Sequence, residues 1–264
     1  GRILYRESEC CRMKTKKVIC ENEGGDEMNM KMPIGIDDFA EARENCYLVD
    51  KTGFLSKFLP QHAKVTLFAR PRRFGKTLTL SMMRYFLDIE GAQEHRKLFE
   101  GLRVAEDAAT MAWQGTRPVL FLTLKDWKGK SWEAMLENIR FLLGNLFSER
   151  DFLLKDDMKE RDCRNFQAIL DGTAGEPLLR DGLAFLVRLF SVHYGRKAVL
   201  LLDEYDAPIQ EAWANGFYND AIDFFRTFFS RAIKTNETLD FAVLTGVLRV
   251  SKEVSSLTSV IAKA

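Results

Sequence analysis

The sequence of 264 residues contains few residues of the types that build disulfides or histidine metal sites. Its five cysteines are an odd number without C-x-x-C spacing, which favours free thiols and argues against a zinc site. Its three histidines are far apart in the chain, which is typical of surface or helix-end positions. The cysteines are Cys10, Cys11, Cys20, Cys46 and Cys163, and the histidines are His62, His95 and His193.

The sequence also lacks long apolar runs and a charge excess. No segment reaches the roughly 20 apolar residues that span a membrane. Residues 1–17 contain no apolar core of a secretory signal, so we expect a cytoplasmic protein without a membrane partner. The formal net charge of +1 is not the basic excess of a dedicated nucleic-acid binder. The hydrophobic content of 46% suits one domain with a large core.

The pattern beyond residue 31 is that of an α/β domain. Residues 1–31 are polar and show no periodicity, so we expect a flexible tail there and the folded domain at 32–264. Four apolar runs, separated by helical patterns, predict strands at 65–69, 119–124, 198–202 and 241–244. Because parallel neighbours need helical crossovers, this alternation predicts an α/β fold with a mainly parallel sheet. The first run is apolar throughout, which favours a central, buried strand.

Capping residues predict where several helices begin and end. Asp37 or Asp38 can cap a short helix, and Asp50 can cap the next one. Ser131 precedes a long amphipathic pattern and predicts its first turn. Gly195 follows another long apolar pattern and predicts its end, because glycine readily adopts the left-handed conformation found there.

The segment after the first strand has the pattern of a phosphate-binding loop, and its residues are Phe74, Gly75, Lys76 and Thr77. Glycine allows positive φ and a close approach to phosphate, and the N–H groups of the following helix start attract the anion. Lys76 would reach the β- and γ-phosphates, and the Thr77 hydroxyl would bind Mg²⁺. The alternative is a basic surface turn. Arg70 stands where the pattern G-x-x-x-x-G-K-[ST] has its first glycine.

A second motif ends the third predicted strand. Leucines 200–202 lead into Asp203 and Glu204, as in a Walker B strand. Asp203 would hold Mg²⁺ at the carboxyl end of its strand, and Glu204 would orient and deprotonate water. The alternative is a strand that ends in a charged loop, with Asp203 capping the helix that follows.

The fourth predicted strand ends in a further polar residue, Thr245. In P-loop ATPases with a Walker B glutamate, a strand between the two motif strands often carries a polar sensor of the γ-phosphate. Thr245 fits that position, and Arg249 follows four residues later as a second candidate. The alternatives are a turn residue before Gly246 and a surface arginine.

Five segments, in order, resemble the bacterial AAA-ATPase-like family over about residues 32–257. They are Met32–Phe39, Tyr47–Thr52, Arg70–Thr77, Leu202–Asp206 and Thr245–Arg249. Members of this family typically read R-P-R-R-F-G-K-[ST], so Arg70 is a family feature. The resemblance implies ATP binding and hydrolysis with Mg²⁺, and it adds Pro71, Arg72 and Arg73 to the residues expected at the nucleotide.

The resemblance also implies the fold and the partners. The fold is the P-loop NTPase three-layer sandwich of the additional-strand type, with strand order 5-1-4-3-2, in which the four predicted strands are strands 1 to 4. Strand 5 and a PD-(D/E)XK nuclease-like domain would lie beyond Ala264, so we expect the domain to be incomplete there. Strand 65–69 would then be an edge, unless Tyr47–Val49 or a partner covers it. An oligomer and nucleic acid are further partners that this family context implies.

Three functions follow from these motifs. The first is an ATPase with Glu204 activating water. The second is a nucleotide-binding switch or interaction module without turnover, because an arginine finger or lid is missing from this sequence. The third is a small-molecule kinase, which shares the phosphate loop but has less use for a water-activating base after Asp203.

Overall fold

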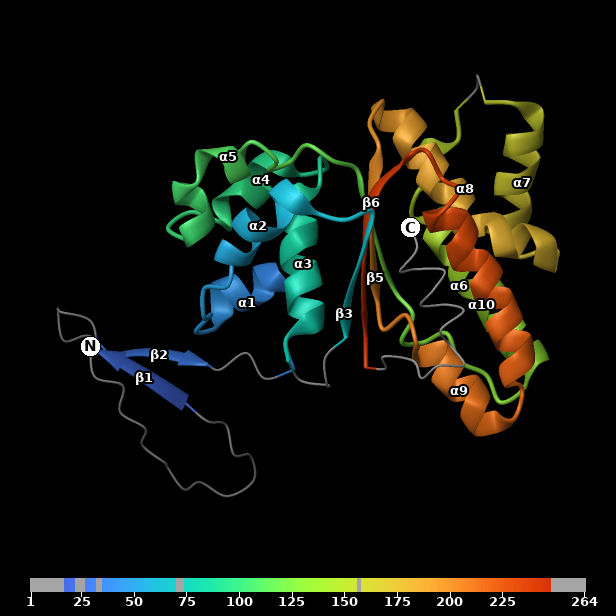
Figure 1. Cartoon of the computed structure of the whole chain (residues 1–264), viewed down its shortest axis with the longest axis horizontal. Coiled ribbons are helices and arrows are strands. Elements are labelled where there is room, and N and C mark those ends of the chain that lie inside the picture. Colours follow the sequence, from blue (N-terminus) through green and yellow to red (C-terminus); the bar gives the residue numbers. More distant parts are fainter. Residues whose placement is uncertain (1–16, 22–26, 32–34, 70–73, 156–157, 248–264) are drawn as a thin grey trace. The chain divides into compact units, whose positions relative to one another are not determined.

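The computed structural model describes residues 17–21, 27–31, 35–69, 74–155 and 158–247. The chain divides into two compact units, the first made of residues 1–60 and 77–116 and the second of residues 61–76 and 117–264 (Figure 1). Among the described residues, no helix has both the length and the apolar character that crossing a membrane requires.

The second unit contains a parallel four-stranded sheet. Its strands are β3 (Val65–Ala69), β4 (Val119–Thr123), β5 (Ala198–Asp203) and β6 (Leu239–Gly246). They lie in the order β3-β6-β5-β4, and every neighbouring pair is parallel. This confirms the predicted α/β class, and β6 lies between β3 and β5, as the order 1-4-3-2 implies for these strands.

The prediction of a central position for β3 is wrong for the described sheet. β3 has one described neighbour, β6, and forms an edge, as the family's strand order predicts when strand 5 is absent. All five of its residues are only half-buried. Residues 47–49 form no strand in the described structure. An apolar run reports burial of both faces of a strand, but it does not report whether a second neighbour is present.

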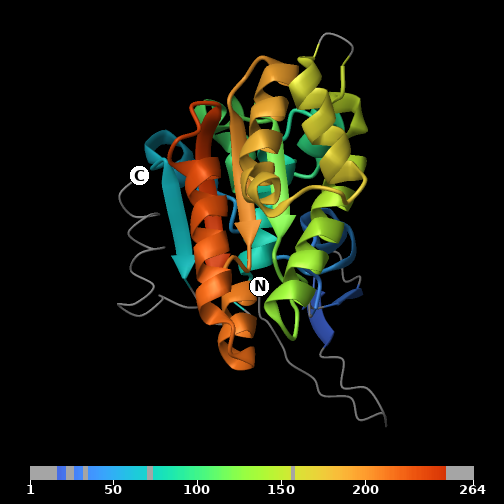
Figure 2. The ribbon, with the colours of Figure 1, turned by 90° about the vertical axis from the view of Figure 1, so that its right-hand side faces the viewer.

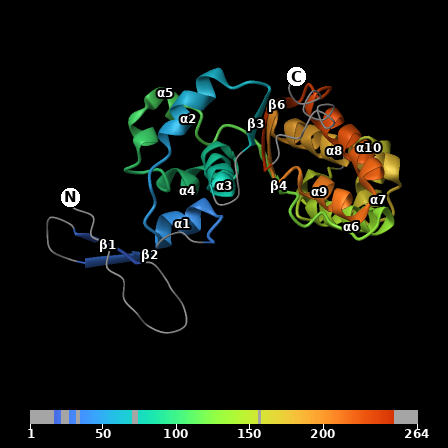
Figure 3. The ribbon, with the colours of Figure 1, turned by 60° about the horizontal axis from the view of Figure 1, so that its bottom comes forward.

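Five helices of the second unit lie on one side of the sheet (Figures 2 and 3). They are α6 (Trp132–Ser148), α7 (Glu160–Leu170), α8 (Glu176–Tyr194), α9 (Ala207–Asn215) and α10 (Tyr218–Ile233), with the short 3₁₀ helix η3 (Asp151–Leu153) after α6. Alternate strand residues such as Leu120, Leu200 and Ala242 share one core cluster with them, because side chains alternate between the faces of a strand.

Aromatic side chains fill the core beneath α10. Four side chains of that helix are fully buried, and they form two stacked pairs: Phe224 with Phe228, and Phe225 with Phe229. Trp127, from the loop after β4, packs against Phe225 and Phe228 with ring centroids 6.3 and 5.6 Å apart. The loop at the carboxyl end of β4 is therefore anchored in the same core as α10.

Two of the predicted helix ends are confirmed. The Ser131 hydroxyl accepts a hydrogen bond from the Ala134 N–H at 3.3 Å and caps α6. Gly195 follows α8 with a φ of 63°, the left-handed conformation expected of a glycine at that position. The helix α9 has no counterpart among the predicted elements.

The first unit is built from short helices around α3 (Lys76–Leu87), whose first residue belongs to the second unit (Figure 1). The others are α1 (Phe39–Asn45), α2 (Gly53–Phe58), η1 (Leu59–Gln61), α4 (Ala92–Lys97), η2 (Arg103–Glu106) and α5 (Ala108–Met111). As predicted, the Asp38 carboxylate caps α1 by accepting from the Glu41 N–H. It also accepts from the hydroxyls of Ser81 and Tyr85, which fastens α1 to α3.

The prediction that Asp50 caps α2 is wrong. Thr52 is the N-cap residue and makes no side-chain capping bond. The Asp50 carboxylate instead accepts from the Thr52 N–H and hydroxyl and from the Arg103 N–H at 2.9 Å. Burial by itself would raise the pKa of Asp50, but these hydrogen bonds outweigh it and hold the pKa below its ordinary value. Asp50 therefore ties the start of α2 to η2.

Two short strands lie within the segment that the sequence predicts as a tail. β1 (Lys17–Glu21) and β2 (Glu27–Lys31) pair antiparallel, with Ile19 opposite Asn29 (Figure 1). Their five-residue lengths give too few alternations of polar and apolar residues for a period of two to be recognised.

The buried aromatic core gives a stability prediction. We expect Phe228→Ala to lower the free energy of unfolding by about 3–5 kcal/mol, because Phe228 is fully buried and its removal leaves a cavity. Phe141→Ala is the matched control, since that side chain is 64% exposed and its loss should change stability by less than about 0.5 kcal/mol. Urea denaturation measures both, and equal effects would contradict the described core.

Candidate functional site

The candidate site lies where the parallel strands of the second unit end. In a parallel sheet, the carboxyl ends of all strands meet at one edge, where ligands of α/β proteins commonly bind. Asp203 is the last residue of β5, and its neighbour across the ladder in β4 is Thr123. Thr245 lies near the end of β6, opposite Phe68 of β3. The sheet register therefore brings Asp203 and Thr245 to the same edge.

Thr245 connects β6 to the residues that follow β5. It is fully buried, and its hydroxyl donates to the Asp203 carboxylate. The same hydroxyl oxygen accepts from the Glu204 N–H at 3.3 Å, and the Thr245 carbonyl accepts from the Tyr205 N–H at 3.0 Å. Thr245 is thus a buried strand residue, and the alternative that it is a turn residue is excluded.

Asp203 is a buried carboxylate that faces β6. It is 3% exposed, and it accepts from the Thr245 hydroxyl. The N-cap residue of α9 is Asp206, which makes no side-chain capping bond, and Asp203 is not at the helix start. The alternative that Asp203 is a helix cap is therefore excluded. A buried carboxylate at the end of a strand is a suitable ligand for a hard cation such as Mg²⁺.

Glu204 has a strained backbone. With a φ of 50°, it is the only residue other than glycine that has a positive φ in the described part of the chain. Such a conformation costs on the order of 1–3 kcal/mol and persists only where the surroundings hold it. Here the Glu204 N–H bonds to Thr245, and its carbonyl accepts from the Ala207 N–H at 3.0 Å. Strain of this kind is concentrated at functional sites.

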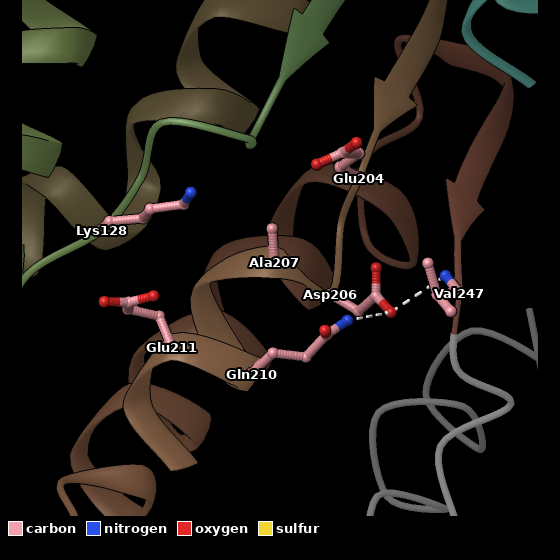
Figure 4. A pocket seen from close by; sticks show the side chains of 7 residues that line it. All are labelled: Lys128, Glu204, Asp206, Ala207, Gln210, Glu211 and Val247. Carbon is pink, nitrogen blue, oxygen red and sulfur yellow. Dashed lines mark hydrogen bonds between the residues drawn. The ribbon is translucent and has the colours of Figure 1, made fainter. Parts of the chain in front are cut away.

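The Glu204 side chain lines a small pocket beside α9 (Figure 4). The other lining residues are Lys128, Asp206, Ala207, Gln210, Glu211 and Val247. The pocket volume of about 160 Å³ is below the range of roughly 300–1,000 Å³ of small-molecule sites. It can take water or a small group beside Glu204, but not a whole nucleotide.

Lys128 is a residue of this pocket that no motif in the sequence indicates. It follows the carboxyl end of β4, in a loop held by the buried Trp127 and by Asn138. The Asn138 amide donates to the carbonyls of Asp126 and Lys128 at 2.7 and 3.1 Å. The position of Lys128 after a parallel strand is the one feature of the sequence that indicates a site residue. Lysine is so common in loops that this position alone does not identify Lys128 as one.

The phosphate-loop residues have the predicted local structure where it is described. β3 ends at Ala69, α3 begins at Lys76, and Gly75 has a φ of 69°, which confirms the predicted positive φ. Phe74 is 59% exposed. The other predicted nucleotide-binding residues, Arg70, Pro71, Arg72 and Arg73, lie outside the described residues, and so does Arg249.

The two predicted magnesium ligands belong to different units. Thr77 lies in the first turn of α3 in the first unit, and Asp203 lies in the second, so their approach stays a prediction. Among the described residues, no three His, Cys, Asp or Glu side chains gather as a metal-binding group. Magnesium in nucleotide sites needs only one or two protein ligands besides phosphate and water, so a hydroxyl and a buried carboxylate fit it.

Tyr205 is the buried residue between Glu204 and Asp206. Burial raises the pKa of the Tyr205 phenol far above its ordinary value, and the neighbouring Asp206 carboxylate raises it further. The phenol therefore stays protonated at neutral pH. Its ring packs against Phe229 of α10, which anchors the loop after β5 in the aromatic core.

The Thr245 hydroxyl gives a second stability prediction. Thr245→Val keeps the shape but leaves the buried Asp203 carboxylate and the Glu204 N–H without this partner, so we expect a loss of about 1–3 kcal/mol. Thr245→Ser keeps the hydroxyl and is the control. Thermal unfolding compares them, and a valine variant as stable as the serine variant would rule out this bonding.

The comparisons with known proteins agree with these motifs. Residues 33–256 match the family described as "Predicted AAA-ATPase" (AAA-ATPase_like). The chain is 31% identical over 226 residues to the "Uncharacterized protein in vnfD 5'region" of Azotobacter chroococcum mcd 1, over 84% of this chain and 38% of that protein. No solved structure matches the chain. Because the family match spans most of its length, the chain belongs to the AAA-ATPase-like family of predicted AAA-ATPases.

Proposed function

We propose that this chain binds Mg²⁺-ATP and hydrolyses it. The observation that carries the proposal is the bonded set of Asp203, Thr245 and Glu204 at the carboxyl edge of the sheet. β3 ends at the same edge and leads to Gly75 and Lys76. A buried carboxylate, a strained glutamate and a glycine–lysine helix start are the parts that a phosphoryl-transfer site requires.

The nucleotide is bound through its phosphates. Gly75 has the positive φ of a phosphate loop, and the N–H groups at the start of α3 supply partial positive charge. In the proposal, Lys76 contacts the β- and γ-phosphates, while the segment 70–73 with its three arginines adds positive charge near them. Thr77 and Asp203 would hold Mg²⁺, which would neutralise charge on the phosphates.

Hydrolysis depends on the residues after β5 and β6. Glu204 orients the attacking water and takes its proton as the water oxygen attacks the γ-phosphorus. The bond from that phosphorus to the oxygen bridging the β- and γ-phosphates breaks, and ADP leaves with that oxygen. Thr245 detects the γ-phosphate through its link to Asp203, and Arg249 is the proposed second sensor. The Thr245 hydroxyl already accepts a hydrogen bond from the Glu204 N–H. A shift in the position of Thr245 therefore moves Glu204 directly.

The proposed partners follow from the family rather than from the described residues. The Azotobacter relative is longer than the part that this chain matches, since the alignment covers 38% of it. We propose that the nucleotide site acts with a further domain or subunit. The resemblance to the family implies that this is a nuclease-like domain that acts on nucleic acid. DNA binding by this chain that weakens with added salt would support the nucleic-acid role, and no binding at low salt would count against it.

Nucleotide binding has a direct test in Lys76. We expect Lys76→Ala to weaken ATP binding by about 10- to 100-fold, because charge-assisted hydrogen bonds contribute about 1.5–3 kcal/mol. Lys97→Ala removes the same charge from an exposed position on α4 and should bind as the parent does. Isothermal titration calorimetry with Mg²⁺-ATP measures this, and unchanged affinity in the Lys76 variant would refute the proposed phosphate site.

Turnover has its own test in Glu204. We expect Glu204→Gln to lower kcat by about 10²- to 10⁴-fold with ATP affinity retained, because the amide cannot accept the proton of water. Glu94→Gln, an exposed change on α4, is the matched control. Phosphate release measures the rate. If the parent and the variant bind ATP alike and neither hydrolyses it, the chain is a nucleotide-binding module. Transfer of phosphate to a metabolite would make it a kinase.

A further inference from the structure

Asp206 and Gly246 belong to the family-like segments, but the proposed phosphate chemistry gives them no role. Asp206 is a charged residue that is only 2% exposed, two positions after Glu204. Gly246 follows Thr245 at the end of β6. A buried carboxylate is costly unless hydrogen bonds compensate for the lost water, so the partners of Asp206 indicate why it is there.

The Asp206 carboxylate bonds to two different elements (Figure 4). Its Oδ2 atom accepts from the backbone N–H of Val247 at 3.1 Å, just after β6. The same oxygen accepts from the side-chain amide of Gln210, on the next turn of α9, at 2.7 Å. Asp206 therefore joins the chain that leaves β6 to the first turns of α9.

Gly246 allows this close approach. A Cβ atom on residue 246 would lie 2.6 Å from Cε1 of Tyr205 and 2.8 Å from Oδ1 of Asp206. Gly246 is not among the glycines with positive φ, so space and not backbone conformation requires glycine here. The end of β6 thus packs directly on the residues that follow Glu204.

Hydrogen bonds join the end of β6 to the residues that follow β5, both before and after Glu204. On the side of β5, the Thr245 hydroxyl bonds Asp203 and the Glu204 N–H. On the side of α9, the Tyr205 N–H bonds the Thr245 carbonyl, and the Val247 N–H bonds Asp206. The strained Glu204 lies between these two groups of hydrogen bonds. The Asp206–Val247 bond is the one farthest along the chain from β5.

We propose that Asp206 is a positioning residue for the reaction, acting through Val247 and the end of β6. It fixes residues 245–247 against the loop after β5, which keeps the Glu204 carboxylate in its reacting position and the Thr245 hydroxyl on Asp203. Although Asp206 also lines the pocket beside Glu204, it acts through these hydrogen bonds and not on the nucleotide. The inference rests on the proposed ATPase function and adds a residue to which the phosphate motifs assign no role.

The test compares alanine and asparagine at position 206. We expect Asp206→Ala to lower kcat by roughly 100-fold, as misplacement of a reacting group does, with the Kd for Mg²⁺-ATP changed by less than about twofold. Asp206→Asn should restore most of kcat. Its amide oxygen, placed where Oδ2 lies, accepts from both the Val247 N–H and the Gln210 amide.

Two further variants keep the test decisive. Asp220→Asn makes the same charge change at an exposed position on α10 and should leave kcat unchanged. If Asp206→Ala does not fold, Gln210→Ala removes one of the Asp206 bonds at a half-buried position, and we expect kcat to fall by a smaller factor at constant Kd. The inference is overturned if the folded variants keep the parent kcat, or if Kd rises in step with the loss of kcat.

A second measurement separates this inference from the proposed function. Amide hydrogen exchange at Val247 should quicken in Asp206→Ala and recover in Asp206→Asn, whether or not ATP is hydrolysed. A parent chain that binds ATP without turnover would refute hydrolysis, and the Val247 exchange would still report the Asp206 bond. Unchanged exchange in the alanine variant would refute the proposed action of Asp206.

Discussion

The hydroxyl of Thr245 is the interaction on which the arrangement of the candidate site depends. It is a single buried group that donates to Asp203 and accepts from the Glu204 N–H. A buried carboxylate beside an unpaired N–H would be costly, so this hydroxyl stabilises both. It also fixes the start of a turn in which Glu204 has a positive φ. The ends of β5 and β6 therefore behave as one structural element, and the proposed metal ligand and base are two parts of it.

The rest of the second unit packs against this element. The register of the parallel sheet sets Asp203 and Thr245 at one edge, and the aromatic side chains of α10 support the loops at that edge from below. Tyr205 packs on Phe229, and Trp127 packs on Phe228, so the loops after β5 and β4 share one core. Preorganised polar groups on a rigid support are what electrostatic stabilisation of a transition state requires. The fold thus supplies the support, and a few polar residues supply the chemistry.

Much of this arrangement is predictable from the sequence, for identifiable reasons. The strands are predictable because short apolar runs that alternate with helical patterns are typical of buried parallel strands, and Gly75 because a phosphate loop needs its φ. The role of Asp50 is not, because it depends on a neighbour distant in sequence, the Arg103 N–H. The apolar run of β3 likewise suggests a central strand, and only the strand order of the resembled family indicates the edge position that β3 has in the described sheet. The Asp206–Val247 bond joins residues 41 positions apart, and no local pattern indicates it. Sequence periodicity reports what a residue is near along the chain, whereas a site depends on what is near in space.

We propose, in sum, that the segment from β3 to α3 and the ends of β5 and β6 form one Mg²⁺-ATP site. The decisive experiment is a crystal structure of this chain with Mg²⁺ and a non-hydrolysable ATP analogue. We expect the γ-phosphate within hydrogen-bond distance of the Lys76 amine, Mg²⁺ bound by Thr77 with Asp203 directly or through water, and a water molecule at the Glu204 carboxylate. A nucleotide bound elsewhere, or phosphates that contact neither Lys76 nor the N-terminus of α3, would contradict the proposed site.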